Sequence, residues 1–326
     1  MRKKLIAAIV LLFSFLGFLF FENQAKTYYT PQKEYHRIVI LSDAHYPSKL
    51  TSDENATGRQ KKIDNKLSAI NDINSWNDVD LVVFLGDIVE KLGNKSDYAQ
   101  AKAFVDKLTK PKALIAGNHE FMYEDHLTEN GKLQWASPEL RAKKLERFKN
   151  VFQISNLYYS RRIDNYLLIF LSPDVTNGKY LTEISTEQLS WLEKTLAANK
   201  TRPTLIFFHA PLAGTLASYN KDANTPNFVA QPEKQLHDLL MNNPQILLWV
   251  SGHTHTPATN PSFDAPINFY EGKILDLHNP TLDGKTIWTN SIYLYPDKIS
   301  IRTYNHQTGE FVENLDRTIP VNFTAK

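Results

Sequence analysis

Five short apolar runs, each followed at once by polar residues, constrain the fold of this chain more than any other feature. The runs are rich in β-branched and aromatic residues, which is typical of buried strands. Because ligand sites of layered α/β proteins form where strands end, we expect the polar residues to meet at one edge of the fold. In chain order, residues 37–42 precede Asp43-Ala44-His45, 80–85 precede Gly86-Asp87, 112–116 precede Gly117-Asn118-His119-Glu120, 204–208 precede His209, and 246–251 precede Gly252-His253-Thr254-His255.

The polar segments together supply two carboxylates, one amide and several imidazoles, and no thiolate. This oxygen and nitrogen donor set suits Mn, Fe or Zn better than a soft metal. Taken singly, a D-x-H or a G-H-x-H segment is better explained by a turn aspartate or by a polar histidine with satisfied hydrogen bonds. Five such segments, each at the end of an expected strand, predict a metal centre.

The order D-x-H, G-D, G-N-H-E, a single His and G-H-x-H resembles the calcineurin-like metallophosphoesterase superfamily, over residues 36 to 304. The resemblance implies a four-layer α/β/β/α sandwich of two mixed sheets, with a binuclear metal site at the strand-terminal loops. It also implies two divalent metal ions, Mn, Fe or Zn. Position by position, Asp43, His45 and His255 would bind one ion, Asn118, His209 and His253 the other, and Asp87 would bridge both.

The resemblance also implies a mechanism and two catalytic residues. A hydroxide that bridges the two ions would attack phosphorus in line, and His119 would protonate the leaving oxygen as general acid. Glu120 would orient His119 and fix its tautomer, although a solvated loop carboxylate remains the alternative for this residue. Of the histidines outside the motifs, His126 is the one candidate for substrate contact.

Two departures from known patterns narrow the branch of the superfamily. Glu90 stands where purple acid phosphatases place a tyrosine, and Lys91 stands where G-D-x-x-D-R-G protein phosphatases place the arginine that grips phosphate. The stretch T-E-Q-L-S-W-L-E at 186–193 resembles the cyclic-nucleotide phosphodiesterase and purple-acid-phosphatase-like branches. We therefore expect hydrolysis of a phosphodiester or nucleotide-type ester. The alternatives are a phosphomonoesterase, a protein phosphatase, or a cell-surface binding module that kept the scaffold without turnover.

The resemblance implies a small-molecule phosphate ester as the partner, and the charge of the chain argues against a nucleic acid. The formal net charge of the 326 residues is only +2, which argues against a nucleic-acid binder. The short basic clusters at 59–62 and 141–144 are expected to be solvated helix faces. The chain has no cysteine, so it can form no disulfide and carry no lipid on a lipobox thiol. The oligomeric state stays open.

The amino terminus has the pattern of a targeting segment. Arg2-Lys3-Lys4 precedes an apolar stretch at 5–21, and polarity resumes at Glu22. We expect residues 1–25 to be a signal peptide or an uncleaved membrane anchor, 26–35 a linker, and 36–326 the catalytic domain. Either form predicts a secreted or membrane-anchored enzyme whose catalytic domain is extracytoplasmic.

Between the strands, the apolar spacing predicts helices around 61–74, 96–108, 138–149, 185–199 and 231–242. The tail alternates polar and apolar residues and predicts antiparallel strands at 285–290, 291–296 and 298–304, with Pro296-Asp297 as a turn. The segments 46–59, 121–137, 212–231 and 256–284 are expected to be loops that wall the site.

Overall fold

The structure is a computed structural model that describes residues 33–48, 55–217 and 222–322. The expected targeting segment at 1–25 lies outside the described residues. Within the described part of the chain, no helix is both long and apolar enough to cross a membrane.

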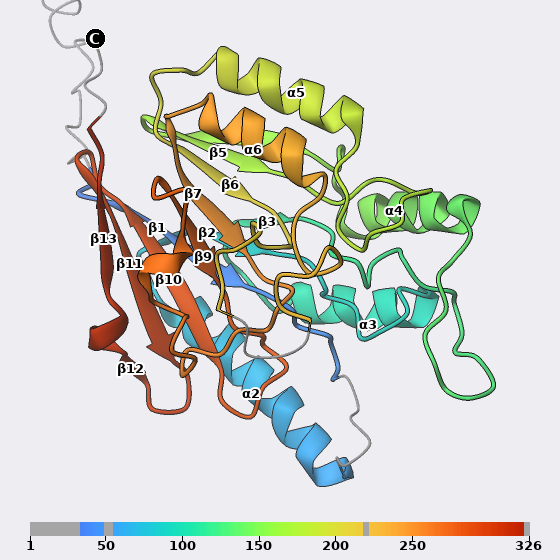
Figure 1. The fold of residues 1–326 in the computed structure, drawn as a ribbon. Coiled ribbons are helices and arrows are strands. Elements are labelled where there is room, and N and C mark those ends of the chain that lie inside the picture. Colours follow the sequence, from blue (N-terminus) through green and yellow to red (C-terminus); the bar gives the residue numbers. More distant parts are fainter. Residues whose placement is uncertain (1–32, 49–54, 218–221, 323–326) are drawn as a thin grey trace, which may run out of the picture. The chain divides into compact units, whose positions relative to one another are not determined.

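The first sheet joins the amino-terminal strands to the carboxyl-terminal ones (Figure 1). Its centre is β1 (His36–Leu41), which pairs in parallel with β2 (Val79–Phe84) on one side and antiparallel with β10 (Trp288–Leu294) on the other. The parallel side ends with β3 (Lys112–Leu114). The antiparallel side continues through β11 (Lys298–Asn305) to β12 (Glu310–Phe311) and β13 (Arg317–Pro320).

The second sheet is built from the middle of the chain, in the order β4-β5-β6-β7-β9-β8. Its four central strands are parallel, and its two edge strands are antiparallel. The strands are β4 (Tyr159–Ile163), β5 (Tyr166–Phe170), β6 (Thr204–Phe207), β7 (Ile246–Ser251), β9 (Ile274–His278) and β8 (Phe269–Tyr270).

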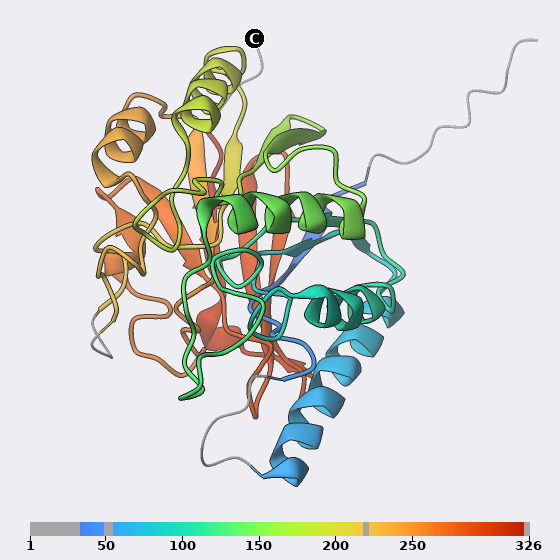
Figure 2. The same ribbon diagram turned by 90° about the vertical axis from the view of Figure 1, so that its right-hand side faces the viewer.

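Three apolar cores hold together the four layers that Figures 1 and 2 show. The inner core lies between the sheets, where Ile40 and Val83 of the first sheet pack with Phe207 and Val250 of the second. One outer core joins the first sheet to α2 (Ala56–Ser75), α3 (Lys95–Val105) and α4 (Pro138–Phe152). The other joins the second sheet to α5 (Thr186–Ala197) and α6 (Glu233–Met241). The predicted four-layer α/β/β/α sandwich of two mixed sheets is therefore confirmed.

Several local predictions needed correction. The strands expected at 285–290 and 291–296 are one continuous strand, β10, and the predicted turn at Pro296-Asp297 follows it. The hairpin of β4 and β5 was missed, and the segment 256–284 contains β8 and β9 rather than loop alone. The first helix, α2, begins at Ala56, five residues before its expected start, because the side chain of Asn55 caps the Gly58 amide.

The parallel strands aim their carboxyl ends at the candidate ligands. Asp43, Asp87 and Asn118 follow β1, β2 and β3. His209 and His253 follow β6 and β7 of the other sheet. Since the two sheets pack face to face, both sets of loops converge at one edge of the sandwich.

Candidate metal centre

The loops that carry the candidate ligands are tied to one another by backbone hydrogen bonds. The Asp43 amide donates to the Gly86 carbonyl at 3.2 Å, and the His45 amide donates to the Asp87 carbonyl at 2.9 Å. From the second sheet, the His253 amide donates to Asp43 Oδ2 at 3.0 Å. Segments more than two hundred residues apart in sequence therefore share one hydrogen-bonded frame.

Five candidate ligands sit in an unfavourable backbone conformation. Asp43, His45, Asp87, His253 and His255 have φ values of 51°, 41°, 49°, 64° and 52°, and nine described non-glycine residues in all have positive φ. A side-chain-bearing residue in this region costs on the order of 1–3 kcal/mol. Strain concentrated at the candidate ligands indicates that the position of these side chains, rather than local stability, determines the backbone here.

Two glycines leave room for the ligands. A Cβ on Gly117 would lie 2.4 Å from Asp87 Oδ1 and 2.8 Å from Cε1 of His209. A Cβ on Gly252 would lie 2.5 Å from Asp43 Oδ2. These glycines are needed because the backbone passes closer to the ligand side chains than any other residue would allow.

The first group of donors consists of Asp43, His45 and His255. The Nε2 atoms of His45 and His255 lie 3.2 Å apart, and His255 Nε2 lies 3.2 Å from Asp43 Oδ1. Asp43 and His45 are fully buried, and the His255 side chain is 35% exposed. The three side chains thus present one donor atom each to a common point.

The second group forms around Asp87. Its Oδ2 lies 3.3 Å from His209 Nε2 and 3.8 Å from His45 Nε2, so this oxygen faces both groups. Asn118 Oδ1 lies 3.2 Å from the same His209 nitrogen. His253 also presents a ring nitrogen within reach of Asp87 and His209. Asp87 therefore lies between the two sets of donors.

Backbone carbonyls determine which ring nitrogen of His45, His209 and His253 faces the cluster. Nδ1 of His45 lies 3.2 Å from the Glu90 carbonyl, and Nδ1 of His209 lies 2.7 Å from that of Leu85, so Nε2 of both rings faces the cluster. His253 is reversed, because its Nε2 lies 2.9 Å from the Asn227 carbonyl and Nδ1 is left for the cluster. Such contacts fix the ring orientation and tautomer of ligating histidines.

The cluster favours positive charge at its centre. Burial opposes the ionisation of Asp87, but the charges of His209 and His119 outweigh it and hold the pKa of Asp87 well below its usual range. Burial likewise opposes protonation of His209, yet the carboxylates of Asp87 and Asp43 raise its pKa to about 9. Burial, with His209 nearby, lowers the pKa of His253 to about 3. The two carboxylates thus stabilise a cation among imidazoles that do not all protonate together.

The Glu120 carboxylate is bound by backbone amides and is not exposed to solvent. The residue is fully buried, and its carboxylate accepts hydrogen bonds from four backbone amides. Nδ1 of His119 instead lies 2.6 Å from the Lys91 carbonyl. The alternative prediction, that Glu120 is a solvated loop carboxylate, is therefore wrong. The hydrogen bonds of the Glu120 carboxylate connect the turn after β2 to the turn after β3. The donors are the amides of Gly117 at 2.6 Å, Asp87 at 2.7 Å, Ile88 at 2.8 Å and Val89 at 3.1 Å.

Tyr123 is a residue near the cluster that sequence analysis missed. Its ring lies 4.9 Å from that of His119, and its hydroxyl accepts a hydrogen bond from Asn118 Nδ2 at 3.3 Å. That contact turns Asn118 Oδ1 toward His209. Burial and the charge of Asp87 raise the pKa of Tyr123 above its ordinary value, so the phenol keeps its proton at neutral pH.

Two buried lysines support the loops, although the cluster at 141–144 was expected to be solvated. Lys144 of α4 donates to the carbonyls of Leu92 at 2.6 Å and Tyr123 at 2.5 Å. Lys66 of α2 pairs with Asp283 at 2.6 Å and also donates to the Pro47 carbonyl. The signal for Lys144 was its spacing: the buried face of α4 runs through Arg141, Lys144, Leu145 and Phe148.

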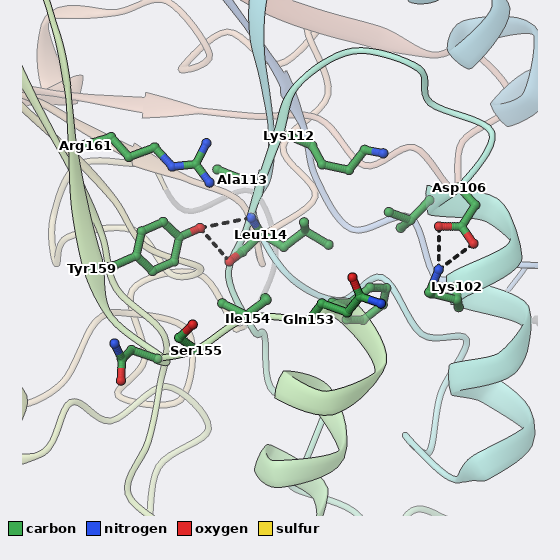
Figure 3. A pocket seen from close by; sticks show the side chains of 13 residues that line it. Lys102, Asp106, Lys112, Ala113, Leu114, Gln153, Ile154, Ser155, Tyr159 and Arg161 are labelled. Atoms are coloured by element: carbon green, nitrogen blue, oxygen red, sulfur yellow. Dashed lines mark hydrogen bonds and ion pairs between the residues drawn. The ribbon is translucent and has the colours of Figure 1, made fainter.

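A separate groove of about 470 Å³ lies where α3 and the end of α4 meet β3 and β4 (Figure 3). Its lining includes Lys102, Lys112 and Arg161, but none of the candidate ligands. The Tyr159 hydroxyl there bonds both the amide and the carbonyl of Leu114, at 3.2 and 3.1 Å. This hydroxyl caps the outer edge of β3, so the groove is a feature of the sheet edge and not of the metal centre.

The sequence pattern of the calcineurin-like phosphoesterase family matches residues 36–257. This chain belongs to that family. A probable glycerophosphodiester phosphodiesterase, GpdQ, of Arcobacter nitrofigilis is 27% identical over 223 residues, which make up 68% of this chain and 72% of that protein. As a calcineurin-like phosphoesterase, the protein is a metal-dependent phosphoric ester hydrolase.

Two solved structures share the fold of this phosphoesterase. A dimetal phosphatase from Danio rerio matches with a TM-score of 0.60 and 17% identity, over 90% of this chain and 100% of that one. A purple acid phosphatase from yellow lupin (Lupinus luteus) seeds matches with a TM-score of 0.56 and 15% identity, over 89% of this chain and 54% of that one.

The donor atoms of this phosphoesterase fit a divalent ion. Asp43 Oδ1 is buried and accepts no hydrogen bond within the described ranges, which is costly for a carboxylate oxygen unless a cation binds it. Two ligand atoms about 2.0–2.1 Å from one zinc ion lie roughly 3.3 Å apart in tetrahedral geometry. The 3.2 Å separations among Asp43, His45 and His255 agree with that spacing.

The close approach of Gly117 predicts metal loss when a side chain is added there. We expect Gly117→Ala to displace Asp87 and His209 and to lower metal affinity at least about tenfold, while circular dichroism stays that of the folded protein. Metal retained after dialysis measures the effect. Gly131→Ala is the control, because it strains a turn with a φ of +71° but adds a Cβ that meets nothing within 4 Å and so displaces no candidate ligand. Wild-type metal content in Gly117→Ala would contradict the described packing.

Proposed function

We propose that this phosphoesterase hydrolyses phosphodiesters, with two divalent ions held by the two donor groups and joined by Asp87. Asp43, His45 and His255 would hold one ion, and Asn118, His209 and His253 the other. The observation that carries the proposal is the position of Asp87 Oδ2, 3.3 Å from His209 and 3.8 Å from His45. When bound, two divalent ions supply an activated water and a clamp for the oxygens of an in-line displacement.

The protein groups around that centre would select and orient the phosphate. The two carboxylates balance only part of the charge of two divalent ions, and the amide oxygen of Asn118 ligates without cancelling more. The centre therefore attracts an anionic phosphoryl group. His119 is held by the Lys91 carbonyl at Nδ1 and by its own amide, which donates to Asp87 Oδ1 at 2.8 Å. Its Nε2 would donate a proton to the leaving oxygen.

The preference for diesters is supported by the relative named as a probable glycerophosphodiester phosphodiesterase. It is also supported by the residues that replace known phosphatase signatures. Glu90, in the place of the purple-phosphatase tyrosine, bonds through its carboxylate to Arg59 at 2.8 Å, so no phenolate is available for iron(III) at this position. We propose Mn, Fe or Zn as the ions.

A pair of aryl esters tests the diester preference with one chromophore. We expect the metal-loaded protein to hydrolyse bis(p-nitrophenyl) phosphate with a kcat/KM at least about tenfold above that for p-nitrophenyl phosphate. Chelation should abolish both activities, and adding Mn, Zn or Fe back should restore them and show which ion serves. A higher kcat/KM for the monoester would contradict the proposed diester preference. Metal binding without either activity would support the alternative, a binding module that kept the scaffold without turnover.

The role of His119 is tested by changing the leaving group. We expect His119→Ala to keep its metal and to lose roughly 10²–10⁴-fold in rate for an alkyl diester, with a smaller loss for a nitrophenyl diester that needs no proton. Because a His119 nitrogen also lies within reach of His45 and Asp87, metal content is measured in the same samples. Metal loss would make His119 a ligand. His237→Ala, on α6 and outside every candidate ligand group, is the matched control.

We also propose that residues 1–25 export the enzyme, as a cleaved signal or as an anchor. The support is the basic cluster at Arg2 before the apolar stretch at 5–21. Mass spectrometry of the mature amino terminus separates the two forms. A chain that begins near Lys26 is released, and one that keeps residues 5–21 is tethered. A catalytic domain that external protease cannot reach in intact cells would contradict both.

A further inference from the structure

The hydroxyl of Tyr123 has one hydrogen-bonding capacity that the protein does not use. It accepts from Asn118 Nδ2 at 3.3 Å, and its own proton finds no acceptor among the described residues. The side chain is only 7% exposed, so bulk water does not readily take that proton. A buried hydroxyl with an unused proton, beside a metal ligand, is a donor for whatever binds there.

The position of that hydroxyl is fixed by its surroundings. The Tyr123 carbonyl accepts from the buried Lys144 ammonium at 2.5 Å, and its backbone pairs with Trp135 in an isolated bridge. Its ring lies against that of His119, with the centroids 4.9 Å apart. The donor is thus held from three sides and does not have to be ordered when a ligand binds.

A phosphoryl group at this centre needs donors for oxygens that the ions do not bind. The arginine that serves protein phosphatases is replaced here by Lys91, whose carbonyl is used to hold His119. A lysine does not offer the planar fork of an arginine. Tyr123 lies beside both His119 and Asn118, and it is the neutral donor that this arrangement leaves free.

We propose that the Tyr123 hydroxyl donates a hydrogen bond to a non-bridging oxygen of the bound phosphoryl group. This rests on the proposed function, and it makes Tyr123 a catalytic residue distinct from the general acid. A donor to a non-bridging oxygen stabilises charge that develops on phosphorus, whichever alcohol leaves. Its contribution therefore does not depend on the leaving group.

The test is Tyr123→Phe in the metal-loaded enzyme. We expect metal content equal to wild type, and a kcat/KM lower by roughly 10–10³-fold by the same factor across a series of aryl and alkyl phosphodiesters. The inhibition constant of orthophosphate should rise about tenfold, because a hydrogen bond to a charged oxygen is lost. His119→Ala, measured on the same series, should show a loss that grows as the leaving alcohol becomes more basic.

Tyr159→Phe is the matched control. It removes a half-buried tyrosine hydroxyl whose bonds go to the Leu114 backbone in the separate groove (Figure 3), so its kinetics should equal those of wild type. Wild-type kinetics and phosphate inhibition in Tyr123→Phe would overturn the proposal. So would loss of metal, since Tyr123 would then only position Asn118. If the wild-type enzyme hydrolyses no diester, the proposed function fails, and orthophosphate binding alone still decides the role of Tyr123.

Discussion

The site depends first on the buried carboxylate of Glu120. Its four amide hydrogen bonds join the turn after β2 to the turn after β3, and so they set Asp87 beside Asn118 and His119. Burial and the charge of Asp87 raise the pKa of Glu120 to about 7, and the amides of Val89 and Gly117 oppose that rise. A carboxylate buried so fully is tolerated only because hydrogen-bond donors surround it.

In the second sheet, a buried carboxylate also holds the loops in place. Asp276 of β9 is fully buried, and its carboxylate accepts from the Leu212 amide at 2.7 Å, from the Thr215 hydroxyl at 2.9 Å and from the Ser251 hydroxyl at 2.6 Å. These contacts hold the loop after His209 to the end of β7. For each sheet, one buried carboxylate, Glu120 in the turn after β3 and Asp276 on β9, therefore organises the loops that carry the candidate ligands.

The sequence identified the candidate ligands, which the structure brings together, but not the groups that hold them in place. A candidate ligand such as Asp43 or His209 follows a strand closely, so local pattern and chain order were enough to predict it. Glu120 was noticed only as the neighbour of His119, and Asp276 lay in a segment read as loop. All four donors to Glu120, and one of the three donors to Asp276, are backbone amides. Nearly every residue type carries such an amide, so these hydrogen bonds cannot be read from the sequence. Tyr123 was missed for a similar reason, because its contact with Asn118 depends on how the loop folds back after β3.

Because the donors come from both sheets, the geometry of the centre is a property of the whole sandwich. The amide of His253 reaches Asp43 across 210 residues of sequence, and no single hairpin or helix could bring those groups together. Strained backbone at five ligands would relax in a loosely packed chain, so the inner core must hold both loop sets in place. Metal binding to the folded state alone then stabilises that core in return, since a ligand that binds only the native state raises its stability. The centre and the four-layer fold are in this sense one cooperative unit.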